Sequence, residues 1–223
     1  MSRQLLPRAF FFALLLCAAV LCRHAYAAQD VARATLANGL RVIVVHDELA
    51  PVVSTAVTYF VGANETPGGA PGTAHALEHV MFRGSPGLSA TQLADVGSIV
   101  GGEFNANTQQ TVTQYLYTVP ADDLEIVLHI EALRMRDLTL SESGWRQERQ
   151  AILQEVARDL SSPMYVLSTR LRQALFAGTP YAHDALGTRE SFLKTTAAAL
   201  TPIGSEVVTS TPGHASRNSA AVW

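Results

Sequence analysis

Strand-like segments occur in adjacent pairs in this sequence, and helix-like segments occur in runs between and after them. β-branched residues bounded by turn signals predict strands at residues 40–45, 52–61, 103–108 and 112–119. Apolar periodicity and capping signals predict a helix that carries residues 75–79 and further helices at residues 90–96, 122–136, 142–160 and 163–178. We therefore expect an α+β fold in which helices pack on a mostly antiparallel sheet.

The first 27 residues have the layout of a secretory signal peptide. Arg3 and Arg8 precede an apolar run at residues 9–21, and the pattern Ala-Tyr-Ala follows at residues 25–27. A membrane anchor is the alternative, but the run is shorter than the roughly 20 apolar residues that a spanning helix needs. We expect cleavage after Ala27 and export to the periplasm or secretion, without membrane insertion after cleavage.

Cleavage would leave an acidic chain without cysteine. Loss of three arginines from 16 basic residues leaves 13 against 19 acidic ones, a formal charge of −6. An acidic surface argues against nucleic acid or anionic lipid as a main partner. Cys17 and Cys22 lie in the removed segment, so the mature chain has no disulfide and must be stabilised by a hydrophobic core.

Residues 75–84 read HALEHVMFRG and contain a candidate metal site. On a helix, His75, Glu78 and His79 fall on one stripe, and the apolar residues at 77, 80 and 81 fall on the opposite one. Histidines at i and i+4 can direct their imidazole nitrogens at one ion, with the glutamate beside it. This is the inverted order H-x-x-E-H of a class of zinc hydrolases. The same spacing also arises by chance on solvated helix faces.

A zinc hydrolase needs a third protein ligand and an open position for water. Candidates occur in the segment ERQAILQE at residues 148–155, where Glu148 and Glu155 are seven residues apart. On a long helix this spacing places both carboxylates on one stripe, two turns apart. Such a pair is not diagnostic by itself, because charged stripes usually face solvent.

Further segments accompany the HALEH motif in order along the chain. They are its continuation VMFRGS, the segment GGEFNA at residues 101–106, the segment ERQAILQE, and Thr-Pro-Tyr at 179–181 with Gly-Thr at 187–188. Together these motifs resemble the pitrilysin (insulinase) family of zinc peptidases, relatives of the mitochondrial processing peptidase. The resemblance covers about residues 35–200 and implies the metal-bearing half of a two-domain α+β unit.

The resemblance also implies roles for individual residues. His75, His79 and Glu155 are expected to bind Zn²⁺, and Glu78 is expected to be the general base. Zinc lowers the pKa of its water toward neutrality, and an uncoordinated carboxylate can take the proton and pass it to the leaving amine. Glu148 is expected to hold a ligand or the water in place, with a surface glutamate as the alternative.

The segment at residues 101–106 is expected to bind the peptide substrate. Asn105 and Ala106 would lie on an edge strand that pairs with an extended peptide, with a strand-end polar residue as the alternative for Asn105. Thr111 departs from the family pattern, because an acidic residue is expected there. Three histidines elsewhere are predicted not to bind metal: His46, His129 and His183.

The resemblance ends near residue 200. Family members usually carry two halves, and the second half, in the same chain or a partner subunit, supplies substrate-binding groups. Residues 28–200 would form one half, incomplete at its C-terminus, because the rest of a helix and an apolar strand are expected next. Residues 201–223 instead hold 11 Ser, Thr, Gly or Pro in 23 positions. This segment is either a natural polar tail or, as we favour, the product of a shifted reading frame, and we expect it to be disordered.

The expected function is a zinc-dependent endopeptidase that hydrolyses extended peptides, with Glu78 as general base and a second pitrilysin-like half or partner subunit. The alternative is a truncated, weakly active or inactive metal-binding half that serves as a binding or assembly subunit. Peptide turnover by the isolated chain discriminates the two.

Overall fold

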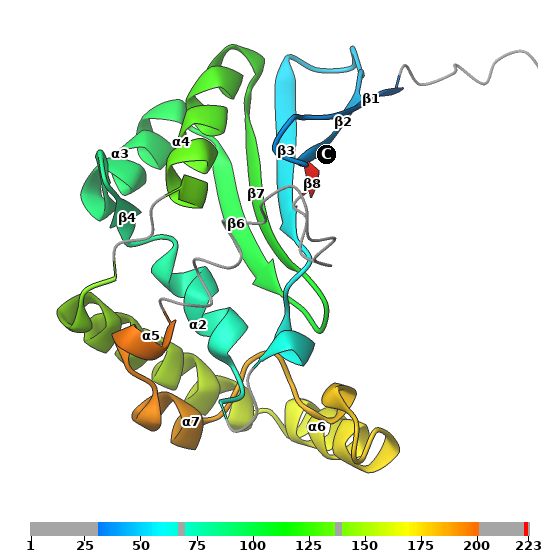
Figure 1. Cartoon of the computed structure of the whole chain (residues 1–223), viewed down its shortest axis with the longest axis vertical. Helices are drawn as coiled ribbons and strands as arrows, with labels where there is room; N and C mark the ends of the chain where they lie inside the picture. The colour runs from blue at the N-terminus through cyan, green and yellow to red at the C-terminus, as the bar shows by residue number, and fades with distance from the viewer. Residues whose placement is uncertain (1–30, 67–69, 137–139, 201–220, 223) are drawn as a thin grey trace, which may run out of the picture.

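The computed structural model describes residues 31–66, 70–136, 140–200 and 221–222. The expected signal peptide and most of the expected tail lie outside these residues. A six-stranded sheet in the order β1-β2-β8-β3-β7-β6 forms one layer of the molecule (Figure 1). Its strands are β1 (Val31–Thr35), β2 (Arg41–Val45), β3 (Val52–Tyr59), β6 (Glu103–Thr108), β7 (Thr113–Pro120) and β8 (Ala221–Val222). Neighbouring strands are antiparallel except β2 and β8.

Helices cover one side of this sheet and confirm the predicted α+β class (Figure 1). The helices next to the sheet are α2 (Thr73–Val80), α3 (Ala90–Val100) and α4 (Leu124–Arg136), and α5 (Glu142–Leu160), α6 (Pro163–Leu175) and α7 (Arg189–Lys194) follow. Helix α5 packs against α2, α6 and α7. Two short strands, β4 (Gly84–Ser85) and β5 (Leu88–Ser89), form a separate hairpin before α3. Within the described ranges, no helix has the length and apolar character required to cross a bilayer.

The predicted strands and long helices are present, and several short elements were not predicted, namely strands β1, β4, β5 and β8 and helix α7. The ladder between β3 and β7 runs from Val52 opposite Pro120 to Tyr59 opposite Thr113. Strand β1 escapes prediction because four of its five residues are exposed, so its pairing with β2 leaves no apolar pattern. Helix α7 is six residues long, too short for a helical period to stand out.

The predicted apolar stripe of α4 is only partly buried. Val127 is 2% exposed, but Leu128 is 44% exposed. Helix α4 instead buries Arg134, which forms an ion pair with Glu131 and donates to the Tyr117 hydroxyl at 2.9 Å. Its guanidinium also lies over three aromatic rings, those of Phe82, Tyr115 and Tyr117. The ion pair and the aromatic rings offset part of the cost of burying this charge, although Arg134 Nε and Nη1 have no hydrogen-bond partner among the described residues. Apolar periodicity does not reveal a buried charge of this kind.

Two residues of the expected disordered tail lie in the sheet. Ala221 pairs with Arg41 of β2 and Thr58 of β3, and Val222 pairs with Val42 and Val57. At these two residues the structure differs from the expectation of disorder. The physical reason is that β2 and β3 stand one strand apart, and their facing backbone groups need hydrogen-bond partners.

Candidate metal centre

A contact between two glycines places the start of α2. Gly72 precedes the helix with a φ of 89°, and Gly187 has a φ of 81°. A Cβ atom on Gly187 would lie 2.6 Å from the Gly72 Cα, closer than side chains tolerate. Glycine permits both the backbone conformation and the approach. The contact brings the loop before α7 against the N-terminus of α2.

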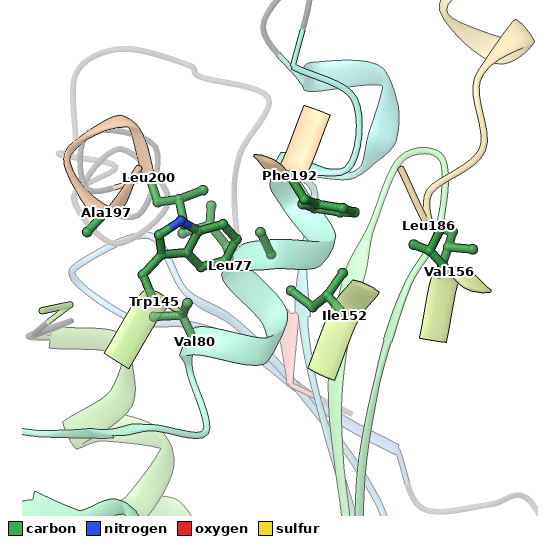
Figure 2. Packing of buried hydrophobic residues seen from close by; sticks show 10 residues of the cluster. Leu77, Val80, Trp145, Ile152, Val156, Leu186, Phe192, Ala197 and Leu200 are labelled. Carbon is green, nitrogen blue, oxygen red and sulfur yellow. The ribbon is translucent and has the colours of Figure 1, made fainter. Parts of the chain in front are cut away.

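A hydrophobic cluster then fixes α2 against α5 (Figure 2). Its buried members are Ala76, Leu77, Val80, Trp145, Ile152, Val156, Leu186, Phe192, Ala197 and Leu200. The Trp145 indole, which is fully buried, donates to the Thr195 carbonyl at 2.8 Å. Because Trp145, Ile152 and Val156 recur at helical spacing, the adjacent stripe of α5 carries Glu148 and Glu155 toward α2.

His75 is 7% exposed, and its Nδ1 lies 3.1 Å from the Leu186 carbonyl oxygen. A carbonyl oxygen only accepts, so Nδ1 carries the proton and donates it. In the neutral imidazole the Nε2 atom therefore carries no proton and has a free lone pair. This is the tautomer that can bind a metal through Nε2.

His79 has an equivalent arrangement with a carboxylate in place of the carbonyl. Its Nδ1 lies 3.1 Å from Glu148 Oε2, and Glu148 also forms an ion pair with Arg83. Glu148 is 5% exposed, so it is not a surface glutamate. With the Nδ1 proton donated to Glu148, the His79 Nε2 atom is likewise free.

The free atoms of three side chains converge on one point. The two Nε2 atoms of His75 and His79 lie 3.1 Å apart, and Glu155 Oε2 lies 3.4 Å from each of them. One ligand atom from each of the three residues lies within 4.8 Å of the others. Two lone pairs and a carboxylate repel one another at these distances unless a proton or a metal ion lies between them.

Protonation is one way to satisfy this arrangement, and a metal ion is another. Hydrogen bonding from His75 and then from His79, in their protonated forms, holds the pKa of the Glu155 carboxyl well below its ordinary value. Glu155 is thus a carboxylate at neutral pH. Two imidazoles and one carboxylate are the donor set of many catalytic zinc sites, so the residues fit the ion.

Glu78 lies on the same helix but has a different contact. Its Oε2 accepts a hydrogen bond from the Thr108 hydroxyl at 2.5 Å, and it is not a member of the converging set. Thr108 is the last residue of β6 and also lies 3.4 Å from the Thr113 hydroxyl. The uncoordinated carboxylate is therefore tied to the strand at the edge of the sheet.

The structure places Asn105 and Ala106 on β6, the edge strand of the sheet. The Asn105 side chain is exposed, and its Oδ1 accepts a hydrogen bond from the Ala106 amide at 2.9 Å. Thr111 is exposed in the turn between β6 and β7. Three histidines predicted not to bind metal are exposed and lie outside the converging set: His46, His129 and His183.

Several residues that shape the site were not identified from the sequence. The Leu186 carbonyl is 111 residues from His75, and a backbone acceptor leaves no sequence signal. Arg83 lies in the flank VMFRGS, and no sequence pattern indicates its ion pair with Glu148. Thr108 lies two residues beyond GGEFNA, and threonine is so common in strands that its presence does not indicate a contact with Glu78.

Comparisons with known proteins identify the family of this chain. Residues 41–189 match the family described as Insulinase (Peptidase family M16). An uncharacterised zinc protease of Mycobacterium leprae is 33% identical over 171 residues, which cover 76% of this chain and 38% of the relative. The zinc protease PqqE of Helicobacter pylori is 31% identical over 155 residues, which cover 69% of this chain and 35% of the relative.

Solved structures show the same fold. A protease from Helicobacter pylori superposes with a TM-score of 0.77 at 26% identity, and the match covers 87% of this chain and 46% of that one. The periplasmic protease PqqL from Escherichia coli superposes with a TM-score of 0.76 at 22% identity, covering 87% of this chain and 22% of that one. This chain thus spans less than half the length of these relatives. It belongs to the insulinase family of peptidases, peptidase family M16.

Proposed function

We propose that the protein is the metal-bearing half of an exported zinc-dependent endopeptidase. The observation that carries the proposal is the convergence of two bare Nε2 atoms and the Glu155 carboxylate at 3.1–3.4 Å. The Nδ1 hydrogen bonds to Leu186 and Glu148 hold both imidazoles in the tautomer that a metal requires. In the proposal, His75, His79 and Glu155 hold the zinc ion.

When bound, zinc acts as a Lewis acid that polarises the peptide carbonyl and lowers the pKa of a water molecule in the open position. Glu78 accepts the proton of the attacking water and donates it to the leaving amine. Thr108 holds the Glu78 carboxylate in one orientation through its hydroxyl. Glu148 keeps His79 aligned, and the ion pair with Arg83 holds the Glu148 carboxylate in place.

The substrate is proposed to be an extended peptide added to β6. The sheet order supports this mode, because β6 is an edge strand with β7 on its other side. Asn105 and Ala106 lie on this strand, and Thr108 at its end contacts Glu78. A peptide that pairs with β6 would therefore pass beside the proposed base.

Two variants test the proposal together. Glu155→Ala should lower the zinc content of the purified chain, because it removes one of three ligands. Glu78→Gln should keep zinc and abolish peptide turnover in an assembly that has activity, because the amide cannot accept a proton. Zinc content is measured by atomic absorption and turnover with a quenched fluorescent peptide. Unchanged zinc in Glu155→Ala would remove that residue from the site, and unchanged turnover in Glu78→Gln would end its assignment as base.

A binding or assembly subunit is the second candidate function. The specific observation in its favour is that the chain spans only 35–38% of the length of two curated relatives. Such a subunit would keep zinc yet show no turnover on its own. The test is addition of a second half from a related protein, which restores turnover if this chain carries the catalytic site and leaves it absent if the chain only binds.

Export is proposed on two grounds. Residues 1–27 have the charge, apolar run and small-residue pattern of a signal peptide. One structural neighbour is described as a periplasmic protease. Mass spectrometry of the protein from a bacterial host should find Gln29 near the new N-terminus, with Ala28 as the first residue.

A further inference from the structure

The two histidines of the metal centre are oriented by acceptors of different kinds. His79 donates its Nδ1 proton to the side chain of Glu148, which an ion pair with Arg83 holds in place. His75 donates its Nδ1 proton to a backbone carbonyl, that of Leu186, in a loop 111 residues away in the chain. Because rotation of the backbone redirects a carbonyl, this acceptor orients the imidazole only if the loop itself is held.

The Leu186 carbonyl belongs to the peptide group between Leu186 and Gly187, so its direction depends on the backbone on both sides. On the Gly187 side, the close approach to Gly72 restricts the chain. On the other side, the Leu186 side chain lies in the hydrophobic cluster (Figure 2), and the Leu186 amide donates to Asp184 Oδ1 at 2.7 Å. The side chain, the amide and the carbonyl of Leu186 thus each have a partner.

Asp184 lies in a part of the loop that is anchored to two other elements. The Tyr165 side chain of α6 lies beside it, and burial, followed by the charge of Asp184, raises the pKa of Tyr165 to about 12. The neighbouring His183 carbonyl accepts a hydrogen bond at 2.9 Å from Nε2 of Gln110, in the turn between β6 and β7. The loop is therefore tied to α6 and to the sheet at the point where Asp184 bonds the Leu186 amide.

We propose that Asp184 is a positioning residue for the metal ligand His75. Its carboxylate holds the Leu186 amide, and this contact fixes the peptide group whose carbonyl accepts the Nδ1 proton of His75. The Nε2 atom of His75 then faces the metal position. The inference rests on the metal centre of the proposed function, and it adds a residue that is not among the converging ligands.

This role predicts an asymmetry between the two histidines. Loss of the Asp184 contact should loosen the hydrogen bond of His75 and leave that of His79 unchanged, because His79 is oriented by Glu148 and not by the loop. A general loss of structure would instead disturb both imidazoles. The two Nδ1 protons therefore serve as internal controls for each other.

The test uses the full chain with isotope-labelled histidine and follows the Nδ1 protons of His75 and His79 by NMR. Each proton is assigned by its loss when that histidine is replaced with glutamine. In Asp184→Ala, the His75 proton should exchange with water roughly tenfold faster than in wild type, and the His79 proton should exchange at the wild-type rate. The zinc dissociation constant should rise about tenfold, as expected when a metal ligand loses its orientation.

Two further variants separate the hydrogen bond from other effects. Asp184→Asn keeps an acceptor oxygen without the charge, so both its His75 exchange rate and its zinc dissociation constant should lie between those of wild type and Asp184→Ala. Asp122→Ala removes an exposed carboxylate in the turn before α4 and should change neither quantity.

Three results would overturn the proposal: an unchanged His75 proton in Asp184→Ala, equal acceleration at His75 and His79, or equal effects of Asp184→Ala and Asp184→Asn. A wild-type chain that binds no zinc would refute the proposed metal centre instead. Exchange of the two Nδ1 protons in the metal-free chain would still test the role of Asp184, because both hydrogen bonds exist without the ion.

Discussion

At the scale of single residues, the two histidines of the site are oriented by the hydrogen bonds of their Nδ1 atoms, which point away from the proposed metal position. The Leu186 carbonyl and the Glu148 carboxylate each take an Nδ1 proton, and this leaves both Nε2 atoms directed at Glu155. Histidines without such partners sample both tautomers and several ring orientations. The ligands here are therefore oriented by their neighbours before a metal binds.

The Thr108 hydroxyl is expected to position the base. Thr108→Val keeps the shape of the side chain and removes the hydrogen bond to Glu78. A hydrogen bond to a charged group contributes about 1.5–3 kcal/mol, so kcat should fall by roughly tenfold or more in an active assembly. Zinc content should be unchanged, because the Thr108 side chain contacts Glu78 and Thr113 and none of the three proposed ligands.

Two further variants control this measurement. Thr108→Ser should restore most of kcat, since it returns the hydroxyl. Thr118→Val removes a hydroxyl on β7 that contacts Ser54 on the exposed part of the sheet, and it should leave kcat unchanged. A kcat for Thr108→Val equal to that of wild type would show that Glu78 does not depend on this contact.

At the scale of elements, the close approach of Gly72 to Gly187 holds the loop before α7 in place. That loop carries the Leu186 carbonyl to His75. Gly187→Ala would force a Cβ against the Gly72 Cα and the Phe192 ring, at 2.6 and 2.8 Å. An alanine there is disfavoured both by this crowding and by the left-handed backbone conformation. The substitution should therefore lower the free energy of unfolding by about 2–4 kcal/mol. Zinc affinity should fall as well, since the His75 acceptor moves.

Gly39→Ala is the matched control for that substitution. Gly39 has a φ of 87°, but a Cβ there meets nothing within 4 Å. Gly39→Ala should lower the free energy of unfolding by about 1–2 kcal/mol, from backbone strain alone, and should leave zinc affinity unchanged. Thermal unfolding and zinc titration measure both quantities. If Gly187→Ala and Gly39→Ala lowered stability and zinc affinity equally, the close approach of Gly72 to Gly187 would not be what positions the loop.

Sequence patterns predicted some elements well and others poorly, for physical reasons. The amphipathic face of α2 placed His75, Glu78 and His79 together, because helical geometry alone determines which side chains share a face. The contact of Glu155 with that face depends on the packing of α5 against α2, which the resemblance supplied and periodicity did not. The Leu186 carbonyl and the Glu131–Arg134 pair are long-range or buried polar contacts, and no local pattern encodes them.

At the scale of the whole molecule, the described fold leaves apolar surface without a partner. Helix α6 exposes Met164, Leu167, Leu171 and Leu175, each more than half exposed and at helical spacing. Contiguous exposed apolar surface marks sites of association in soluble proteins.

The isolated chain is therefore expected to turn over peptides slowly even with zinc bound. A site open on one side loses part of the positioning of the scissile bond, which contributes several kcal/mol to lowering a barrier. Turnover of a quenched fluorescent peptide should be near background for the chain alone and rise when a second half from a related protein is added. A rate for the isolated chain like that of intact relatives, abolished by Glu78→Gln, would contradict this expectation.

The hydrophobic cluster around Trp145 has a consequence for when the chain can bind a metal ion. His75 and Glu155 meet only when α2 and α5 pack together, and that packing includes Phe192 and Leu200. A chain in which α2 and α5 have not yet packed together does not bring these ligands to one point. We therefore expect zinc to bind only after these helices have packed, in the compartment in which the chain folds.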